Sequence, residues 1–169
     1  MTSDHRQILR LPGIMLGVGL GGFVDGIVLH QVLQWHHMLT STDSDHIGLP
    51  FYPADTVAGL KVNTLWDGLF HVVAWLAVAI GLGVLYARVR RARPRIWSWR
   101  ALCGWLLAGW GLFDLVEGAV DHQILGIHHV RSGPHQVWYD VGFLVFGAAL
   151  VVGGYLLQRS AGAGEPTSR

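Results

Sequence analysis

Histidine and acidic residues recur at the same spacing in two stretches of the chain. Residues 25–37 read DGIVLHQVLQWHH, and residues 117–129 read EGAVDHQILGIHH. Each stretch begins with an acidic residue, has a His–Gln pair five residues later and ends in a His–His pair. Neutral imidazole and carboxylate suit zinc, iron, manganese and copper(II). The repeated pattern therefore predicts a transition-metal site to which both stretches contribute.

Further candidate ligands lie in apolar segments, where ionisable side chains are costly and normally mark function. Asp67 and His71 are one helical turn apart, and Asp140 occupies a similar place later in the chain. The predicted metal ligands are Asp25, His30, His36, His37, Asp67, His71, Glu117, Asp121, His122, His128, His129 and Asp140. The single cysteine, Cys103, lies far from the histidines in the sequence, so a soft thiolate site is not expected.

The helical rise of about 1.5 Å per residue places these side chains at shared depths below the outer helix ends. A middle layer, about 12–15 Å deep, is expected to contain His30, His71, Asp121 and His122. An outer layer is expected to contain Asp67, Asp140, one of His36 and His37, and one of His128 and His129. Asp25 and Glu117 lie deeper and would be lower ligands or proton acceptors. The seven-residue spacing of His30 and His37 would keep both on one helical face.

Four apolar segments must position these residues. They cover residues 12–39, 63–87, 97–130 and 137–158, and each reaches the roughly 20 residues that cross a bilayer as a helix. Of all side chains 51% are hydrophobic and only 14% are charged, and the mean hydropathy is +0.40. This composition excludes a disordered chain, a nucleic-acid-binding protein and an ordinary soluble domain. We therefore expect an all-α integral membrane protein, a bundle of four transmembrane helices.

The basic residues indicate how the helices are oriented. Ten of the 12 lysines and arginines lie near the N-terminus, in the 88–100 loop or near the C-terminus. Cytoplasmic loops carry such an excess, so we expect both termini and this loop, which includes Arg93, in the cytoplasm. The 40–62 loop, which includes Asp43, is expected to face outward. The chain would be a multi-pass protein of the bacterial inner (plasma) membrane.

The two matching stretches also predict an internal duplication. Repeat 1 would cover residues of about 12–90 and repeat 2 residues of about 97–158, each forming a helical hairpin. A pseudo-two-fold axis along the membrane normal would relate the two hairpins. Both repeats would belong to one membrane domain, residues 1–169, in which residues 159–169 form a flexible tail.

The same motifs carry a resemblance to a known family. The stretches DGIVLHQVLQWHH, LWDGLFHVVAW and DLVEGAVDHQILGIHH resemble a bacterial family of predicted four-helix membrane proteins, domain-of-unknown-function family 2243. The similarity extends from Leu11 to Gln158. The resemblance implies the four-helix topology and supplies no activity. It also implies respiratory or metal-handling membrane proteins as partners beside the lipid bilayer, and it leaves a homo-oligomer open.

Three classes of function remain open from the sequence. The first is a membrane metalloprotein that holds copper, iron or zinc in a site open toward the periplasmic side, for a metal-centred redox reaction or for metal handling. The second is a b-type haem protein with His30 and His122 as axial ligands. The third is a metal-free proton or ion pathway, because chains of acidic residues and histidines are typical of proton relays.

Overall fold

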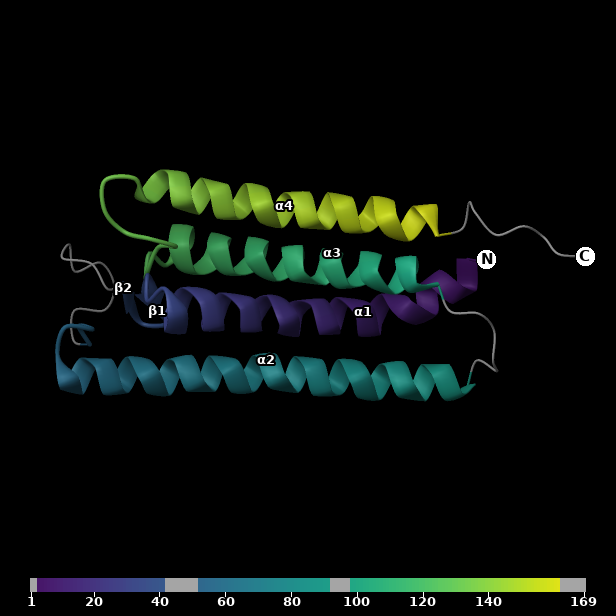
Figure 1. Cartoon of the computed structure of the whole chain (residues 1–169), viewed down its shortest axis with the longest axis horizontal. Helices are drawn as coiled ribbons and strands as arrows, with labels where there is room; N and C mark the ends of the chain where they lie inside the picture. Colours follow the sequence, from purple (N-terminus) through teal and green to yellow (C-terminus); the bar gives the residue numbers. More distant parts are fainter. Residues whose placement is uncertain (1–2, 42–51, 92–97, 162–169) are drawn as a thin grey trace, which may run out of the picture.

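The computed structural model describes residues 3–41, 52–91 and 98–161. Four long helices run side by side along the molecule (Figure 1). They are α1 (Ser3–Val24), α2 (Val57–Arg91), α3 (Trp99–Glu117) and α4 (Gln136–Ser160). The segments Gln7–Val32, Val57–Arg91, Trp99–Ile124 and Gln136–Ser160 are each long and apolar enough to cross a membrane. The prediction of four membrane-spanning helices is therefore confirmed.

The helices α1 and α3 form the centre of the molecule. They pack against each other, while α2 packs on α1 and α4 packs on α3 (Figure 1). Half of the most apolar window of Gln7–Val32 is buried, compared with 11% of the corresponding window in α2. The outer helices therefore present most of their apolar surface outward, as expected of helices that face lipid.

Small residues allow the central helices to approach closely. A Cβ atom at Gly17 would overlap the carbonyl oxygen of Leu106 on α3, and one at Gly109 would overlap the Ile14 carbonyl oxygen on α1. In membranes, such small residues replace side-chain interdigitation and bring helix backbones together. This close contact fixes the relative positions of the ends of α1 and α3, from which most candidate ligands project.

Both central helices change their winding before they end. α1 continues as a π-helical segment, η1 (Asp25–Val32), and α3 continues as η2 (Gly118–Ile124). The prediction that these helices extend to Leu39 and Val130 is therefore wrong. A π-helical stretch places more residues in each turn than an α-helix does and is frequent at functional sites. The candidate ligands that follow η1 and η2, His36 and His128 among them, consequently do not follow α-helical phase.

The chain reverses after each π-helical segment. The backbone takes positive φ angles at Gln34 (50°) and Gly126 (57°), which are 92 residues apart. After the first reversal, β1 (His36–His37) pairs antiparallel with β2 (Thr40–Ser41), so that His36 lies opposite Ser41. The first His–His pair therefore lies on a short strand that folds back over the helix ends, and not on a continuing helix.

Some sequence-based expectations fall on residues that the structure does not describe. These are the interior of the outward loop with Asp43, the part of the basic loop with Arg93, and the tail from residue 162 onward. At the basic end, the guanidinium of Arg88 donates a hydrogen bond of 2.8 Å to the carbonyl oxygen of Ile8. The start of α1 and the end of α4 lie at this same end of the molecule (Figure 1).

Candidate metal centre

Six histidine and acidic side chains gather where α1 and α3 become π-helical. Their exposed fractions are between 0% and 8%, so all six are buried. They form two groups in which one ligand atom per residue can be chosen so that all lie within 4.8 Å of one another. One group consists of Asp25, His30 and His36, and the other of His36, Glu117, His122 and His128. His36 belongs to both groups.

In the first half of the chain, Asp67 on α2 holds the surrounding side chains. Its Oδ1 lies 3.2 Å from His30 Nδ1 and accepts a hydrogen bond of 2.9 Å from the Met38 amide. Its Oδ2 accepts a hydrogen bond of 2.6 Å from His37 Nδ1. The opposite nitrogen of His30, Nε2, lies 3.3 Å from Asp25 Oδ2. Asp67 therefore orients the His30 ring through Nδ1, and Asp25 lies beside the opposite nitrogen, Nε2.

The second half repeats these contacts with Asp140 on α4. Its Oδ2 accepts a hydrogen bond of 2.6 Å from His129 Nδ1, and its Oδ1 accepts one of 3.0 Å from the Val130 amide. Asp140 Oδ1 also lies 3.7 Å from His122 Nδ1, whose Nε2 is 3.0 Å from Glu117 Oε1. A carboxylate behind a histidine is the usual support of a metal-bound imidazole, because it fixes the tautomer and the ring orientation.

His36 and His128 meet between the two halves. Their rings stack with centroids 4.5 Å apart and an interplanar angle of 9°. His36 Nδ1 donates a hydrogen bond of 3.0 Å to the Val130 carbonyl oxygen. Because a carbonyl only accepts, the hydrogen of the neutral ring is on Nδ1 and Nε2 carries a lone pair. This Nε2 atom is buried and has no hydrogen-bond partner among the residues that the structure describes.

The two central rings are neutral at ordinary pH. Burial, together with charge repulsion from neighbouring histidines, His30 among them, lowers the pKa of His36 and that of His128 to about 3. Neutral imidazole is the form that binds metal ions. Burial therefore keeps these two rings ready to act as ligands rather than as cations.

The acidic side chains of the site lack strong cationic partners. Among the described residues, the ion-pair contacts made by Asp25, Asp67, Glu117 and Asp140 are all with histidines. Asp25 Oδ1 and Glu117 Oε2 are buried without a hydrogen-bond partner, and each such atom costs about 1–3 kcal/mol. A metal cation bound between these oxygens and the imidazoles would remove this cost and balance the negative charge.

The distances within the groups fit metal ligands. Glu117 Oε1 lies 3.0 Å from His122 Nε2 and 3.3 Å from His128 Nε2. Around a tetrahedral ion with bonds of about 2.0–2.1 Å, neighbouring ligand atoms are about 3.4 Å apart. Ligand atoms this close converge on a common point without a large rearrangement of the side chains.

The structure places the other predicted ligands outside both groups. His71 Nδ1 donates a hydrogen bond of 2.7 Å to the carbonyl oxygen of Asp67, and its ring lies beside Phe23 and Phe70. Asp121 is half-buried. The predicted ligands that belong to neither group are His37, Asp67, His71, Asp121, His129 and Asp140. Of the predicted middle layer, His30 and His122 thus fall in different groups, and His71 and Asp121 fall in neither.

Two further buried polar side chains, Asp114 and Asn63, lie outside the predicted ligand set. Asp114 lies one turn before Glu117 and is 1% exposed, with Oδ2 unpartnered and a hydrogen bond from Trp110 to its carboxyl group. Asn63 is fully buried: its Oδ1 accepts from the Leu39 amide and its Nδ2 donates to the Tyr52 carbonyl oxygen. The sequence signal for Asn63 was an amide side chain at the start of an apolar segment. In the structure, its hydrogen bond with Leu39 links the reversed chain to α2.

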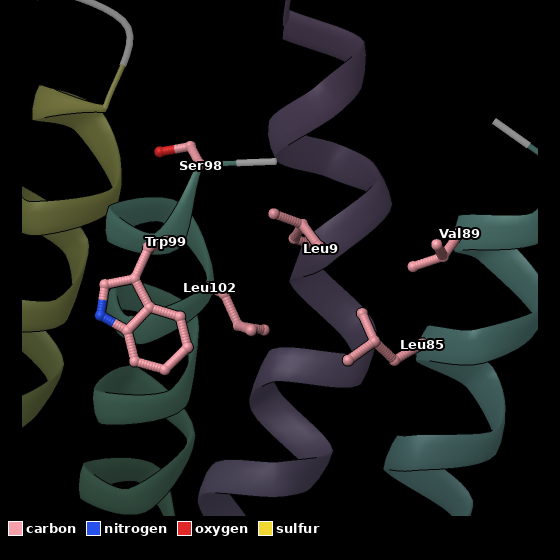
Figure 2. Close-up of a pocket in the computed structure, with 6 residues that line it drawn as sticks. All are labelled: Leu9, Leu85, Val89, Ser98, Trp99 and Leu102. Carbon is pink, nitrogen blue, oxygen red and sulfur yellow. The ribbon is translucent and has the colours of Figure 1, made fainter. Parts of the chain in front are cut away.

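A separate pocket lies at the opposite end of the central helices. It has a volume of about 250 Å³ and is lined by Leu9, Leu85, Val89, Ser98, Trp99 and Leu102 (Figure 2). The lining comes from α1, α2 and the start of α3 and contains no ionisable side chain. The pocket is therefore chemically distinct from the histidine cluster and offers no metal ligands.

The fold and the cluster together define a class: a helical integral membrane protein with buried histidine and carboxylate side chains at one end of its two central helices. A family model described as "Predicted membrane protein (DUF2243)" matches residues 12–161. The chain therefore belongs to this family, and the family resemblance seen in the sequence is confirmed. No curated protein and no solved structure matches the chain.

Proposed function

We propose that this membrane protein binds a transition metal through the buried cluster of Asp25, His30, His36, Glu117, His122 and His128. The observation that carries the proposal is the pair of ligand groups, whose atoms converge in a site without lysine or arginine partners. Imidazole and carboxylate ligands favour copper, iron or zinc over calcium and magnesium. The unpartnered Nε2 of His36 and the outer supports Asp67 and Asp140 agree with this assignment.

The membrane arrangement proposed for the site follows from charge and repetition. Two duplicated hairpins would place both termini in the cytoplasm of a bacterium and the cluster on the periplasmic side of the inner membrane. Three arginines in the last turn of α2, Arg88, Arg90 and Arg91, support this orientation. The equivalent hydrogen bonds of Asp67 and Asp140 support the duplication, because each accepts from a histidine and from the next amide.

The burial of the ligands favours a resident metal centre over transient metal transfer. Exposed fractions of 0–8% leave the ligand atoms little contact with solvent, so exchange would require the reversed segments to open. A resident copper or iron ion would serve electron transfer or another redox reaction, whereas zinc would act as a Lewis acid. Respiratory or metal-handling membrane proteins would then be its natural partners in the bilayer.

The geometry disfavours the haem alternative. His30 and His122 are separated by other imidazoles: the His36 ring lies 4.6 Å from His30 and 6.0 Å from His122 between centroids. The His128 ring lies 6.3 Å and 5.1 Å from the same two rings. A porphyrin between His30 and His122 would have to displace both central rings.

Elemental analysis of untagged, detergent-purified protein tests the proposal. We expect at least one equivalent of copper, iron or zinc per chain, and less than half of that amount in His122→Ala and in His128→Ala. His135→Ala is the matched control, because His135 is an exposed histidine at the start of α4. Absence of metal after reconstitution with each of the three ions would contradict the proposal and favour a metal-free proton pathway.

A further inference from the structure

The cluster contains two equivalent sets of ligands rather than one. Asp25, His30 and His36 recur 92 residues later as Glu117, His122 and His128. Each set contributes one carboxylate and two imidazoles, and all six side chains are buried. Three protein ligands are what catalytic metal sites commonly provide, with the remaining position left for water or substrate. Each half therefore carries the ligands of a complete site.

One ion does not reach both sets. Atoms that share an ion through bonds of about 2.0–2.2 Å lie at most about 4.4 Å apart. Asp25 and His30 fall in one group of mutually close ligand atoms, whereas Glu117, His122 and His128 fall in the other. A single ion bound to either set would leave the carboxylate of the other set without a cation.

The single available lone pair of His36 limits this residue to one of the two groups. It lies within reach of both, but the Val130 carbonyl holds its Nδ1 hydrogen, so only Nε2 has a lone pair to give. One lone pair forms a bond to one ion. The second half has three ligands of its own without His36, whereas Asp25 and His30 need His36 to complete a set of three.

We propose that the protein binds two divalent first-row transition-metal ions, one at Asp25–His30–His36 and one at Glu117–His122–His128. This inference rests on the proposed function and adds the number and the positions of the ions. The two sites are unequal. Glu117 Oε1 contacts both histidines of its set, at 3.0 and 3.3 Å, while among the described residues the ion-pair contact of Asp25 is with His30 only, at 3.3 Å. The site in the second half therefore fills first.

Titration of the metal-free, untagged protein with Co²⁺ tests the inference. Visible absorption follows binding, and elemental analysis after gel filtration gives the number of ions retained. We expect two equivalents that bind in two steps. Asp25→Asn and His36→Ala should each retain one equivalent and lose the weaker step, and Glu117→Gln should lose the stronger step. His135→Ala should bind two equivalents like the unaltered protein.

The outcomes separate the two proposals. Saturation of the unaltered protein at one equivalent, with loss of that ion in both Asp25→Asn and Glu117→Gln, would overturn the two-ion inference and leave metal binding standing. No binding of Co²⁺, copper, iron or zinc would overturn metal binding itself. The titration of the unaltered protein decides between these results even if a variant fails to fold, and circular dichroism of each variant shows whether it is folded.

Discussion

The two halves of the candidate metal centre have similar supporting contacts but different inner carboxylates. In each half an outer carboxylate, Asp67 or Asp140, contacts two histidines and one backbone amide. A second, inner carboxylate lies beside the first of these histidines. The inner carboxylate is Asp25 in one half and Glu117 in the other. The longer side chain of Glu117 reaches a second histidine, His128. The supporting contacts are therefore alike in the two halves, while the contacts of the inner carboxylates differ.

The two halves also differ in the residues around the inner carboxylates. The position 92 residues before Asp114 is occupied by Gly22, so only the second half has an additional buried acid one turn from its inner carboxylate. The chain reversals also differ: Gln34 and Gly126 adopt the same left-handed backbone region, but only Gln34 carries a side chain there. Positions 92 residues apart thus differ in charge and in backbone strain, so the two halves surround their inner carboxylates with different chemistry.

The largest effects are expected from the outer carboxylates. Asp67→Asn and Asp140→Asn each remove a buried charge that holds two histidines, which should lower the free energy of unfolding by about 3–5 kcal/mol. Thermal and chemical unfolding in detergent, followed by circular dichroism, measures the change. Equal losses in the two variants would support the equivalence of the halves.

Asp121→Asn provides the matched control for these variants. Asp121 is an acid at the same end of the molecule, but it is half-buried and lies outside both ligand groups. We expect a change below about 0.5 kcal/mol for this substitution. A loss as large as that of the two outer carboxylates would contradict the assignment of a special supporting role to Asp67 and Asp140.

Exchange of the inner carboxylates should produce an intermediate effect. Glu117→Asp shortens the side chain that reaches two histidines, so we expect the affinity of the stronger ion to fall about 10- to 100-fold, by analogy with the loss of a supporting contact. Asp25→Glu should retain its ion and bind it at least as tightly. Competition with a chelator of known affinity measures both. If the two exchanges had the same effect, side-chain length would not explain the asymmetry.

The smallest effects are expected at the chain reversals. Gly126 has a φ of 57°, so Gly126→Ala should cost about 1–2 kcal/mol of folding free energy. Gln34 already carries a side chain in this region, and Gln34→Gly should change stability by less than about 1 kcal/mol. Thermal unfolding compares the two variants, and a neutral Gly126→Ala would show that the reversal tolerates side chains in both halves.

Sequence reasoning predicted the parts of the molecule that depend on composition and repetition. The four apolar segments and the paired acidic and histidine motifs were sufficient for the membrane-spanning helices and for six buried candidate ligands. Hydropathy does not report where an α-helix becomes π-helical, so the ends of the central helices were placed too late. The spacing of Asp67 and His71 likewise did not reveal that His71 donates a hydrogen bond to the Asp67 carbonyl oxygen.

We have proposed that the buried histidines and carboxylates of both halves hold transition-metal ions. Anomalous diffraction from crystals of the purified protein, recorded at the absorption edge of the metal it contains, tests this most directly. We predict two peaks within about 2.0–2.2 Å of ligand atoms, one beside Asp25, His30 and His36 and one beside Glu117, His122 and His128. The absence of any peak within bonding distance of these six side chains would contradict the account.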